Sequence, residues 1–168
     1  MKKTLIINIL VFVGIILFLI FSFFSIKKVT SNGIKAEVVN NKSVNEQIYV
    51  SDLIKLYKTD KNKFDKLYLN SKITITDDIT NIQLDYIDKE SSYATSYDVI
   101  NLENNLRLFV GHNNFEIVGE LNVGDKITVD SKIISCDTTC ILRDIKYLDD
   151  AGFKYEDNTI IKLVKRAK

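Results

Sequence analysis

The chain has 168 residues, a formal net charge of +1, six Gly, no Pro, one His and two Cys. The near-even charge balance gives no support to a nucleic-acid binder held by a basic surface. The low Gly and Pro content argues against a wholly disordered chain. Residues 5–26 form a run of 22 residues without a charge. The rest, about 140 residues, is enough for one ordinary domain, which disfavours a multidomain enzyme.

The apolar run 5–26 is long enough to cross a bilayer as a helix. At about 1.5 Å per residue it spans roughly 33 Å, against a hydrocarbon core of about 30 Å. A cleaved secretory signal is the alternative, but its apolar core is shorter and ends in small residues, whereas bulky phenylalanines fill the end of this run. We therefore predict a short basic amino end, 1–4, and an uncleaved transmembrane helix that places 5–26 in the lipid bilayer.

Two signals conflict about the side of the membrane on which the following domain lies. More lysines follow the run than precede it, which favours a cytoplasmic domain. A very short basic amino end, an apolar span and then a domain is the usual layout of a signal-anchor, whose domain is exported. We favour export. The predicted location is the cell membrane, with a single span and the C-terminal domain outside the cytoplasm.

The first part of the chain beyond the run contains two kinds of segment. Residues 27–47 are rich in Asn and lack sustained apolar periodicity, so they are predicted to form a flexible tether. From 51 to 68, apolar residues recur at helical spacing and lysines line the other side. This pattern predicts an amphipathic helix, in one or two pieces, at the start of a domain over 48–150.

After this helix the spacing of apolar residues changes from about 3.6 to 2, as expected for strands. Five strands are predicted, at 72–84 with a bend at Asp77 and Asp78, and at 98–102, 106–110, 126–134 and 141–148. The stretch 113–121 is a short helix or a loop. Five strands with a helical crossing after the third are the layout of a small OB-type Greek-key barrel. The predicted fold class is therefore mainly β with an N-terminal helix, a five-stranded barrel preceded by one transmembrane helix.

Cys136 and Cys140 flank a three-residue loop between two apolar stretches. Facing positions across such a hairpin can bring Cα atoms to about 5.5 Å, within reach of a disulfide. A disulfide would favour the exported side of the membrane. Two half-buried reduced thiols are the alternative. A structural zinc needs four ligands, and the chain offers only these two cysteines and the distant His112, so no metal site is predicted.

The carboxyl end, 151–168, is a basic tail. Residues 154–168 carry five Lys or Arg against two acidic residues. The tail is predicted to form either a short amphipathic helix or an added strand that packs against the barrel. Contact of its basic residues with anionic lipid headgroups is the alternative.

No catalytic motif is found. The chain has no Gly-x-Ser-x-Gly, phosphate loop or His-Glu-x-x-His, and His112 is interpreted as a surface loop residue. We predict neither an enzyme nor a cofactor. The acidic side chains near the first strand offer ligands for a hard cation such as Ca²⁺, but a solvated acidic face is the simpler interpretation. These residues are Asp77, Asp78, Asp85 and Asp88.

From residue 50 onward the sequence resembles the tRNA-anti-like branch of OB-fold proteins. The resemblance depends on an opening helix at 50–57, a first strand at 73–76, a turn and strand at 121–129 and a final strand at 141–145. The chain departs from the family pattern at Asp77–Asp78 and at Asp130, where Gly is common. The resemblance implies an OB barrel in a secreted, membrane-tethered or lipid-anchored bacterial protein without an assigned activity, and it supplies no site residues.

The charge and the aromatic residues of this barrel indicate which class of ligand it binds. Residues 77–150 carry six Lys or Arg and fifteen Asp or Glu, a net charge of −9, which disfavours nucleic acid. Tyr86, Tyr97 and Phe109 are candidate ligand-face aromatics, with packing in the core or rim as the alternative. The predicted function is a non-enzymatic binding or scaffold module that contacts a protein or glycan. A membrane-anchored nucleic-acid-binding OB module that faces the cytoplasm is the alternative.

Overall fold

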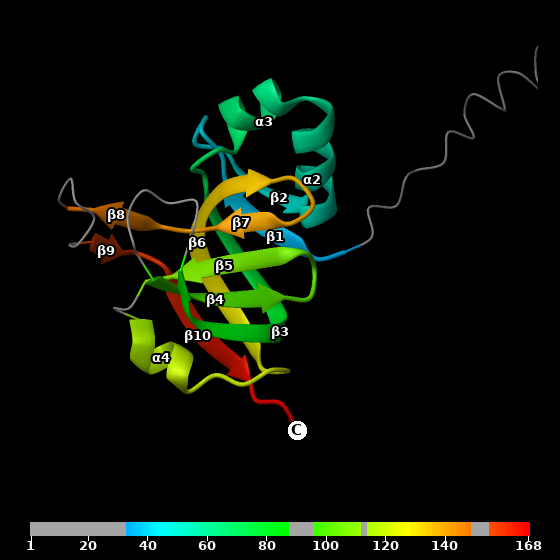
Figure 1. Cartoon of the computed structure of the whole chain (residues 1–168). Coiled ribbons are helices and arrows are strands. Elements are labelled where there is room, and N and C mark those ends of the chain that lie inside the picture. Colours follow the sequence, from blue (N-terminus) through cyan, green and yellow to red (C-terminus); the bar gives the residue numbers. More distant parts are fainter. Residues whose placement is uncertain (1–32, 88–95, 112–113, 149–154) are drawn as a thin grey trace, which may run out of the picture. The chain divides into compact units, whose positions relative to one another are not determined.

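Figure 1 shows a computed structural model of the chain, which describes residues 33–87, 96–111, 114–148 and 155–168. The elements in chain order are β1 (Lys35–Val39), β2 (Asn45–Tyr49), α2 (Val50–Thr59), α3 (Lys61–Leu67), β3 (Lys72–Ile87), β4 (Ser96–Leu102), β5 (Leu106–Val110), α4 (Phe115–Gly119), β6 (Lys126–Cys136), β7 (Cys140–Leu142), β8 (Ile145–Tyr147), β9 (Tyr155–Asp157) and β10 (Ile160–Lys165).

Five of the strands form a closed ring. The order is β3-β4-β5-β7-β6, and β6 pairs again with β3 to close the ring. All pairs are antiparallel except β5 with β7, and α4 follows the third strand of the ring. This is the connectivity of the OB barrel that the sequence predicted. Closure gives every strand of the ring two partners, so the barrel has no exposed sheet edge of its own.

Alternation of apolar and polar residues builds the barrel interior. Along β6, every second residue from Ile127 to Ile133 is buried, and β3 and β5 alternate in the same way. Each buried Leu or Ile contributes about 1.5–3 kcal/mol to folding. The largest buried side chains of the barrel strands are Ile73, Ile75, Ile79, Ile100, Leu106, Leu108, Ile127, Ile133 and Leu142.

The fifth predicted strand, 141–148, is divided in the structure. β7 pairs with β5 and β6, whereas β8 turns away and pairs with β9 in a separate two-stranded ribbon. The break lies at 143–144, where Arg143 N donates to Lys132 O after regular β6–β7 pairing has ended. The ribbon therefore extends away from the barrel end rather than prolonging the ring (Figure 1).

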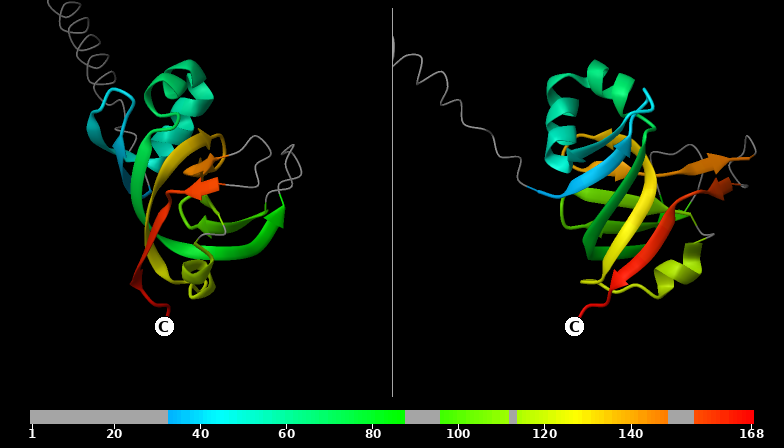
Figure 2. Two further views of the ribbon diagram at one scale, coloured as in Figure 1. Left: turned by 90° about the vertical axis from the view of Figure 1, so that its left-hand side faces the viewer. Right: turned by 180° about the vertical axis from the view of Figure 1, so that it is seen from behind.

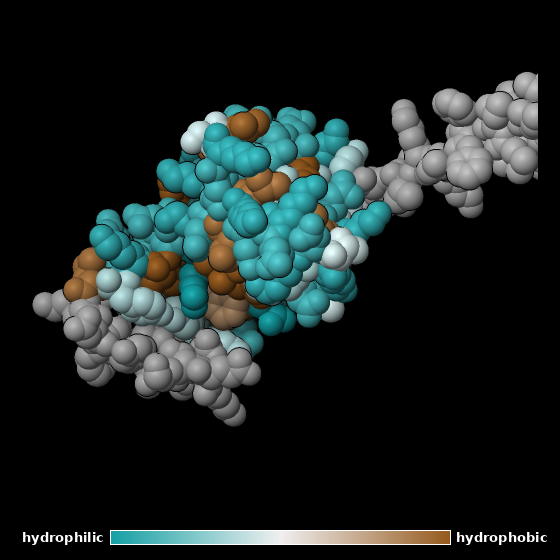
Figure 3. Space-filling model, turned by 90° about the horizontal axis from the view of Figure 1, so that it is seen from above, coloured by the Kyte–Doolittle hydropathy of each residue, from teal (hydrophilic) through white to brown (hydrophobic). Residues whose placement is uncertain are grey.

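The predicted amphipathic helix over 51–68 is present in two pieces, α2 and α3. Asp60 separates them, and its side chain caps α3 by accepting a hydrogen bond from Lys63 N. Leu53 and Phe64 are fully buried, and the Phe64 ring packs edge-to-face on Tyr57 with ring centres 5.0 Å apart. Seen from the α2–α3 side, the surface is mainly hydrophilic, with apolar residues in small patches (Figure 3).

The prediction of a flexible tether over 27–47 is wrong for the described part of that segment. β1 and β2 form an antiparallel hairpin there, and β1 also pairs with β3. Ala36 and Val38 alternate into the core. The Asn residues that suggested a loop build the hairpin turn instead, because Asn40 Oδ1 accepts hydrogen bonds from Lys42 N and Val44 N.

The basic tail forms an added strand, β10, which pairs antiparallel with β6. The four strands β1, β3, β6 and β10 lie side by side on one side of the domain (Figure 2, right). Beyond β10, Asp125 holds the end of the chain: it accepts hydrogen bonds from Ala167 N at 2.7 Å and from Arg166 Nη1 at 3.0 Å. The tail is therefore fixed to the domain rather than presented as a free basic segment.

The fold class needs one correction, which concerns the transmembrane helix. No helix among the described residues is both long enough and apolar enough to cross a bilayer. The segment predicted to span, 5–26, and the basic end 1–4 lie outside the described residues. The fold that the structure shows is a mainly β domain with three helices in its described part.

Candidate binding face

The outward side of β3, β4 and β5 carries an apolar centre, in which Tyr97 and Val99 are buried, at 2% and 3% exposed. Ile100 and Leu102 of β4 point into the barrel core, so their neighbours Tyr97, Val99 and Asn101 point outward. Cross-strand pairing puts Tyr86 beside Tyr97, and it puts Val99 between Gln83 and Phe109. We call this surface the aromatic face and define it as Gln83, Tyr86, Tyr97, Val99, Asn101, Arg107 and Phe109.

The three aromatic side chains singled out in the sequence lie together on this face. Phe109 is central: its ring centre is 5.9 Å from that of Tyr86 and 5.8 Å from that of Tyr97, both edge-to-face. The register shift between Gln83 and Tyr86 makes the contact possible, because it re-aligns the end of β3 so that Tyr86 faces Tyr97.

The three rings differ in exposure. Tyr86 and Phe109 are half-buried, whereas Tyr97 is only 2% exposed and its hydroxyl is hydrogen-bonded to that of Tyr147 on β8. Tyr97 is therefore buried in the structure, which corresponds to the alternative of packing in the core or rim. Tyr86 and Phe109 keep part of their rings accessible.

The ribbon of β8 and β9 is anchored at the end of β5. Asp157 Oδ2 accepts hydrogen bonds from Gly111 N at 2.7 Å and from Asn114 Nδ2 at 3.0 Å. A Cβ atom at Gly111 would lie 2.6 Å from a ring carbon of Tyr155, so a larger residue would displace the ribbon. These contacts could not be predicted from local sequence patterns, because Asp157 and Gly111 lie 46 residues apart.

Besides its rings and Val99, the aromatic face carries the side-chain amides of Gln83 and Asn101 and one cation, Arg107, and the exposed Asp85 lies between Gln83 and Tyr86 on β3. The Arg107 guanidinium donates to Asn101 Oδ1 at 2.9 Å, and Thr80 Oγ1 donates to the carbonyl of Asn101 at 3.1 Å. The amide of Gln83 is exposed. Half-exposed ring edges beside side-chain amides can contact a polar, uncharged ligand through both its apolar and its hydroxyl surfaces.

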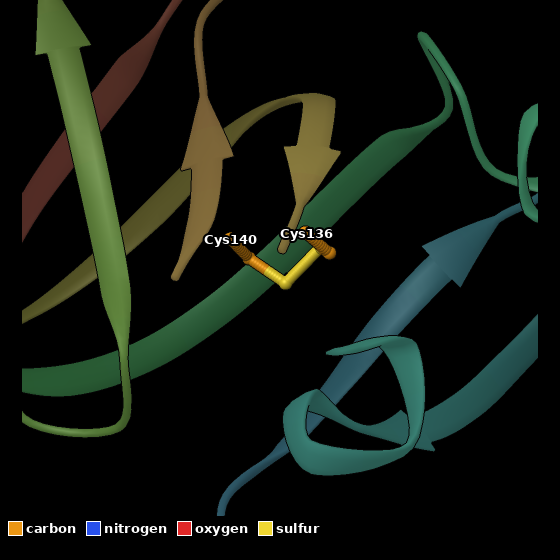
Figure 4. Close-up of a disulfide and its surroundings, with 2 residues drawn as sticks. All are labelled: Cys136 and Cys140. Atoms are coloured by element: carbon orange, nitrogen blue, oxygen red, sulfur yellow. A yellow bond between two sulfur atoms is a disulfide. The ribbon is translucent and has the colours of Figure 1, made fainter. Parts of the chain in front are cut away.

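Cys136 and Cys140 form a disulfide, so the bridged form predicted as one alternative is the one in the structure (Figure 4). The bridge closes the hairpin loop between β6 and β7, with the two Cα atoms 3.8 Å apart. Both cysteines are fully buried, and α2 packs against β6 and β7 at this end of the barrel. The sulfur atoms are therefore shielded from solvent.

Of the acidic residues considered as cation ligands, Asp77 and Asp78 lie together, and Glu103 joins them with carboxylate oxygens within 4.8 Å of one another. Protein groups already engage the two aspartates. Asp77 accepts hydrogen bonds from Asn104 N and Nδ2, and Asp78 forms an ion pair with Lys126. Asp85 does not belong to this group. Asp88 and His112 lie outside the described residues.

A family model described as tRNA_anti-like matches residues 1–146. The chain belongs to the tRNA_anti-like family. The match includes the whole OB barrel and the preceding β1, β2, α2 and α3, whereas β9 and β10 lie beyond it. No curated protein and no solved structure matches the chain.

Proposed function

We propose that this tRNA_anti-like domain is a non-catalytic binding module that works outside the cytoplasm and recognises a neutral oligosaccharide through the aromatic face. In OB barrels, the surface of the second and third strands binds oligonucleotides or oligosaccharides. Here these strands are β4 and β5, which contribute Asn101, Arg107 and Phe109. The observation that carries the proposal is the pairing of half-exposed rings, Tyr86 and Phe109, with side-chain amides on this surface.

Charge favours a sugar over a nucleic acid. Binding of a single strand draws much of its affinity from Lys and Arg that displace counterions from the phosphates. Arg107 is the only cation of the aromatic face, and it already donates to Asn101. Residues 77–150 as a whole carry a net charge of −9. A neutral sugar avoids this repulsion, because its hydroxyl groups need amide and hydroxyl partners rather than cations.

The disulfide supports the extracytoplasmic location. Disulfides persist in oxidising compartments and are rare in the cytosol. The bridge between Cys136 and Cys140 is fully buried, so its sulfur atoms are not accessible to a redox partner. This burial fits a structural role.

The ligand is tested with the full-length protein and two probes, chitotetraose and a single-stranded oligothymidylate, with binding followed by NMR. We expect chitotetraose to shift resonances of β3, β4 and β5, and we expect Phe109→Leu to weaken that binding. Phe115→Leu is the matched control, because Phe115 is an exposed phenylalanine on α4 and does not belong to the aromatic face. Salt-dependent binding of the oligothymidylate would support the nucleic-acid alternative, and no response to chitotetraose would reject a role in binding this class of sugar.

The location is tested separately by trapping the thiol state in cells. Because both sulfur atoms are buried, a thiol reagent must be added together with denaturant at the moment of lysis. We expect Cys136 and Cys140 to be recovered as the unmodified disulfide by mass spectrometry. Recovery of both residues in alkylated form would place the domain in a reducing compartment and overturn this part of the proposal.

A further inference from the structure

A polar groove of about 630 Å³ lies over the β3–β6 pair, on the side of the domain shown at the right of Figure 2. Its floor is formed by outward-facing residues of β3 and β6. The β1–β2 hairpin lines one side, and the other side is lined by Asp144, Asn158 and Ile160, the first residue of β10. The volume is within the range of small-molecule sites. The groove shares no residue with the aromatic face.

Carboxylates define one cross-strand row of this groove. Glu37 on β1 pairs with Thr74 on β3, and Thr74 pairs with Asp130 on β6. Their side chains share the outer face, because Ile73, Ile75 and Val129 at the alternate positions are buried. In the part of the chain that the structure describes, neither Glu37 nor Asp130 forms an ion pair. This acidic row can accept hydrogen bonds from a cationic group.

Lysines define the next row along the strands. Val39 pairs with Lys72, and Lys72 pairs with Lys132. Two like charges directly opposite each other in a sheet are unfavourable. Lys132 is neutralised by Asp144, at 2.6 Å, whereas Lys72 has no ion pair among the described residues. This basic row therefore holds one exposed, uncompensated ammonium group at the floor of the groove.

The spacing of the two rows defines the size of a matching ligand. Residues two apart on one strand lie about 7 Å apart, which separates Lys72 from the acidic row. An extended dipeptide spans about the same distance from its amino to its carboxyl end. We infer that the groove binds an aliphatic dipeptide as a zwitterion, with its ammonium group on Glu37 and Asp130 and its carboxylate on Lys72.

The remaining lining residues fit this assignment. Asn45 lies beside Val39 in the basic row, where its amide can donate to the ligand carboxylate. Val39 and Ile160 are 44% and 50% exposed and stand on opposite sides of the groove, so each offers an apolar contact to a small ligand side chain. A phosphate-rich ligand would meet Glu37 and Asp130, which repel it.

The inference is tested by titrating the full-length protein with L-alanyl-L-alanine and following backbone amide resonances of β1, β3 and β6 by NMR. Two comparison ligands isolate the recognised features. N-acetyl-alanyl-alanine amide keeps the length without the charges, and L-alanine keeps the charges without the length. We expect both to bind at least about tenfold more weakly than the dipeptide, because each loses one charge-matched contact or more. Equal binding of the capped peptide, or no response to the dipeptide, would overturn the inference.

Two variants assign the contacts to residues. Lys72→Gln and Asp130→Asn remove one charge each at positions that are not buried, so both are expected to fold. Each should weaken dipeptide binding about tenfold and leave the weak binding of the capped peptide unchanged. Lys55→Gln on α2 is the matched control, because Lys55 is exposed and lies outside the groove. Dipeptide binding that neither groove variant alters would place the ligand elsewhere and contradict the assignment. This test is independent of the sugar-binding test, because the two surfaces share no residue.

Discussion

The closed barrel and the strands added at its two sides are stabilised in different ways. Each barrel strand has two partners and contributes side chains to a common interior, where Ile100 and Leu108 are fully buried. The β1–β2 hairpin and β10 end the sheet and bury few side chains, chiefly Ala36, Val38 and Ile161. Apolar burial is non-directional and cooperative, so the barrel should unfold as a unit, whereas the added strands depend on individual contacts.

Polar side chains compensate for this shallow burial at the edges. On the hairpin side, Asn41 Nδ2 donates to the carbonyl of Leu69, and Asn41 Oδ1 accepts from the Ser71 hydroxyl. On the other side, Asp125 binds the backbone of Ala167. The added strands form the sides of the polar groove, and the barrel forms its floor. Contacts that fix the edges therefore also fix the groove.

The largest expected effect is loss of stability when a barrel residue is truncated. Leu108→Ala should reduce the free energy of unfolding by about 4 kcal/mol, because the closed barrel cannot collapse around the cavity. Ile161→Ala on β10 should cost about 2 kcal/mol, because an edge strand can shift to fill the space. Urea unfolding followed by circular dichroism measures both. Equal losses would show that β10 belongs to the same cooperative core as the barrel.

Reduction of the disulfide should have an intermediate effect. The bridge closes a loop of only a few residues, so in the chain-entropy description it stabilises the fold by about 2 kcal/mol. Urea unfolding of the wild-type chain with and without reductant measures this difference. A variant with Cys136→Ala and Cys140→Ala is the control and should not respond to reductant. A much larger loss would mean that the bridge, rather than apolar packing, holds the β6–β7 end of the barrel.

The barrel strands could be predicted from the sequence, whereas the pairing of the added strands could not. Barrel strands show strong local alternation, as in Leu106, Leu108 and Val110, and this signal needs no knowledge of the partner strand. β1 contains only two core residues, Ala36 and Val38, next to an Asn-rich turn. Its spacing of apolar residues is therefore too short to distinguish a strand from a tether. The added strands depend on distant pairings that a local pattern does not contain.

The candidate binding face could be predicted only in part, for the same reason. The clustering of Tyr86, Tyr97 and Phe109 follows from their places on three adjacent barrel strands. The burial of Tyr97 does not, because it depends on Tyr147, fifty residues away on a ribbon that replaced part of a predicted strand. The acidic and basic rows of the polar groove could not be predicted either, because they arise from the pairing register of β1, β3 and β6.

A smaller, local effect is expected at the carboxyl end. The backbone hydrogen bond from Ala167, together with that from the backbone of Asn122 and the side-chain hydrogen bond from Arg166, lowers the pKa of Asp125 below its usual value of 3.8. Because the folded-state pKa is depressed, this stabilisation is present above about pH 4 and is lost as the pH falls through the lower folded-state value. The protection factors of the β10 amides, which correct for the slower intrinsic exchange at acid pH, should therefore fall at acid pH in the wild-type chain.

The variant Asp125→Asn tests whether the Asp125 carboxylate causes this pH dependence. The variant should show lower β10 protection factors already at neutral pH and little further change in them on acidification, while the barrel amides stay protected. Asp130→Asn is the matched control, because Asp130 lies on β6 opposite Ile160 of β10, but its side chain forms no hydrogen bond with the tail among the described residues. Faster exchange throughout the barrel in Asp125→Asn would show that the tail and the barrel unfold together.

The smallest effect is expected on the hairpin side, at Tyr68. Burial, followed by a hydrogen bond to Glu46 on β2, raises the pKa of this tyrosine to about 12. The neutral form is thus favoured by folding, so the stabilisation is complete below the usual pKa of 10.0 and is lost as the pH rises through about 12. An absorbance titration should show a late tyrosine step near pH 12, and Tyr68→Phe should remove that late step while changing stability at neutral pH by only about 1 kcal/mol. Glu46→Gln separates the two causes: because burial contributes more than the hydrogen bond, the late step should move only part of the way toward the usual value. A complete return to that value would show that the hairpin contact, rather than burial, governs the titration of Tyr68.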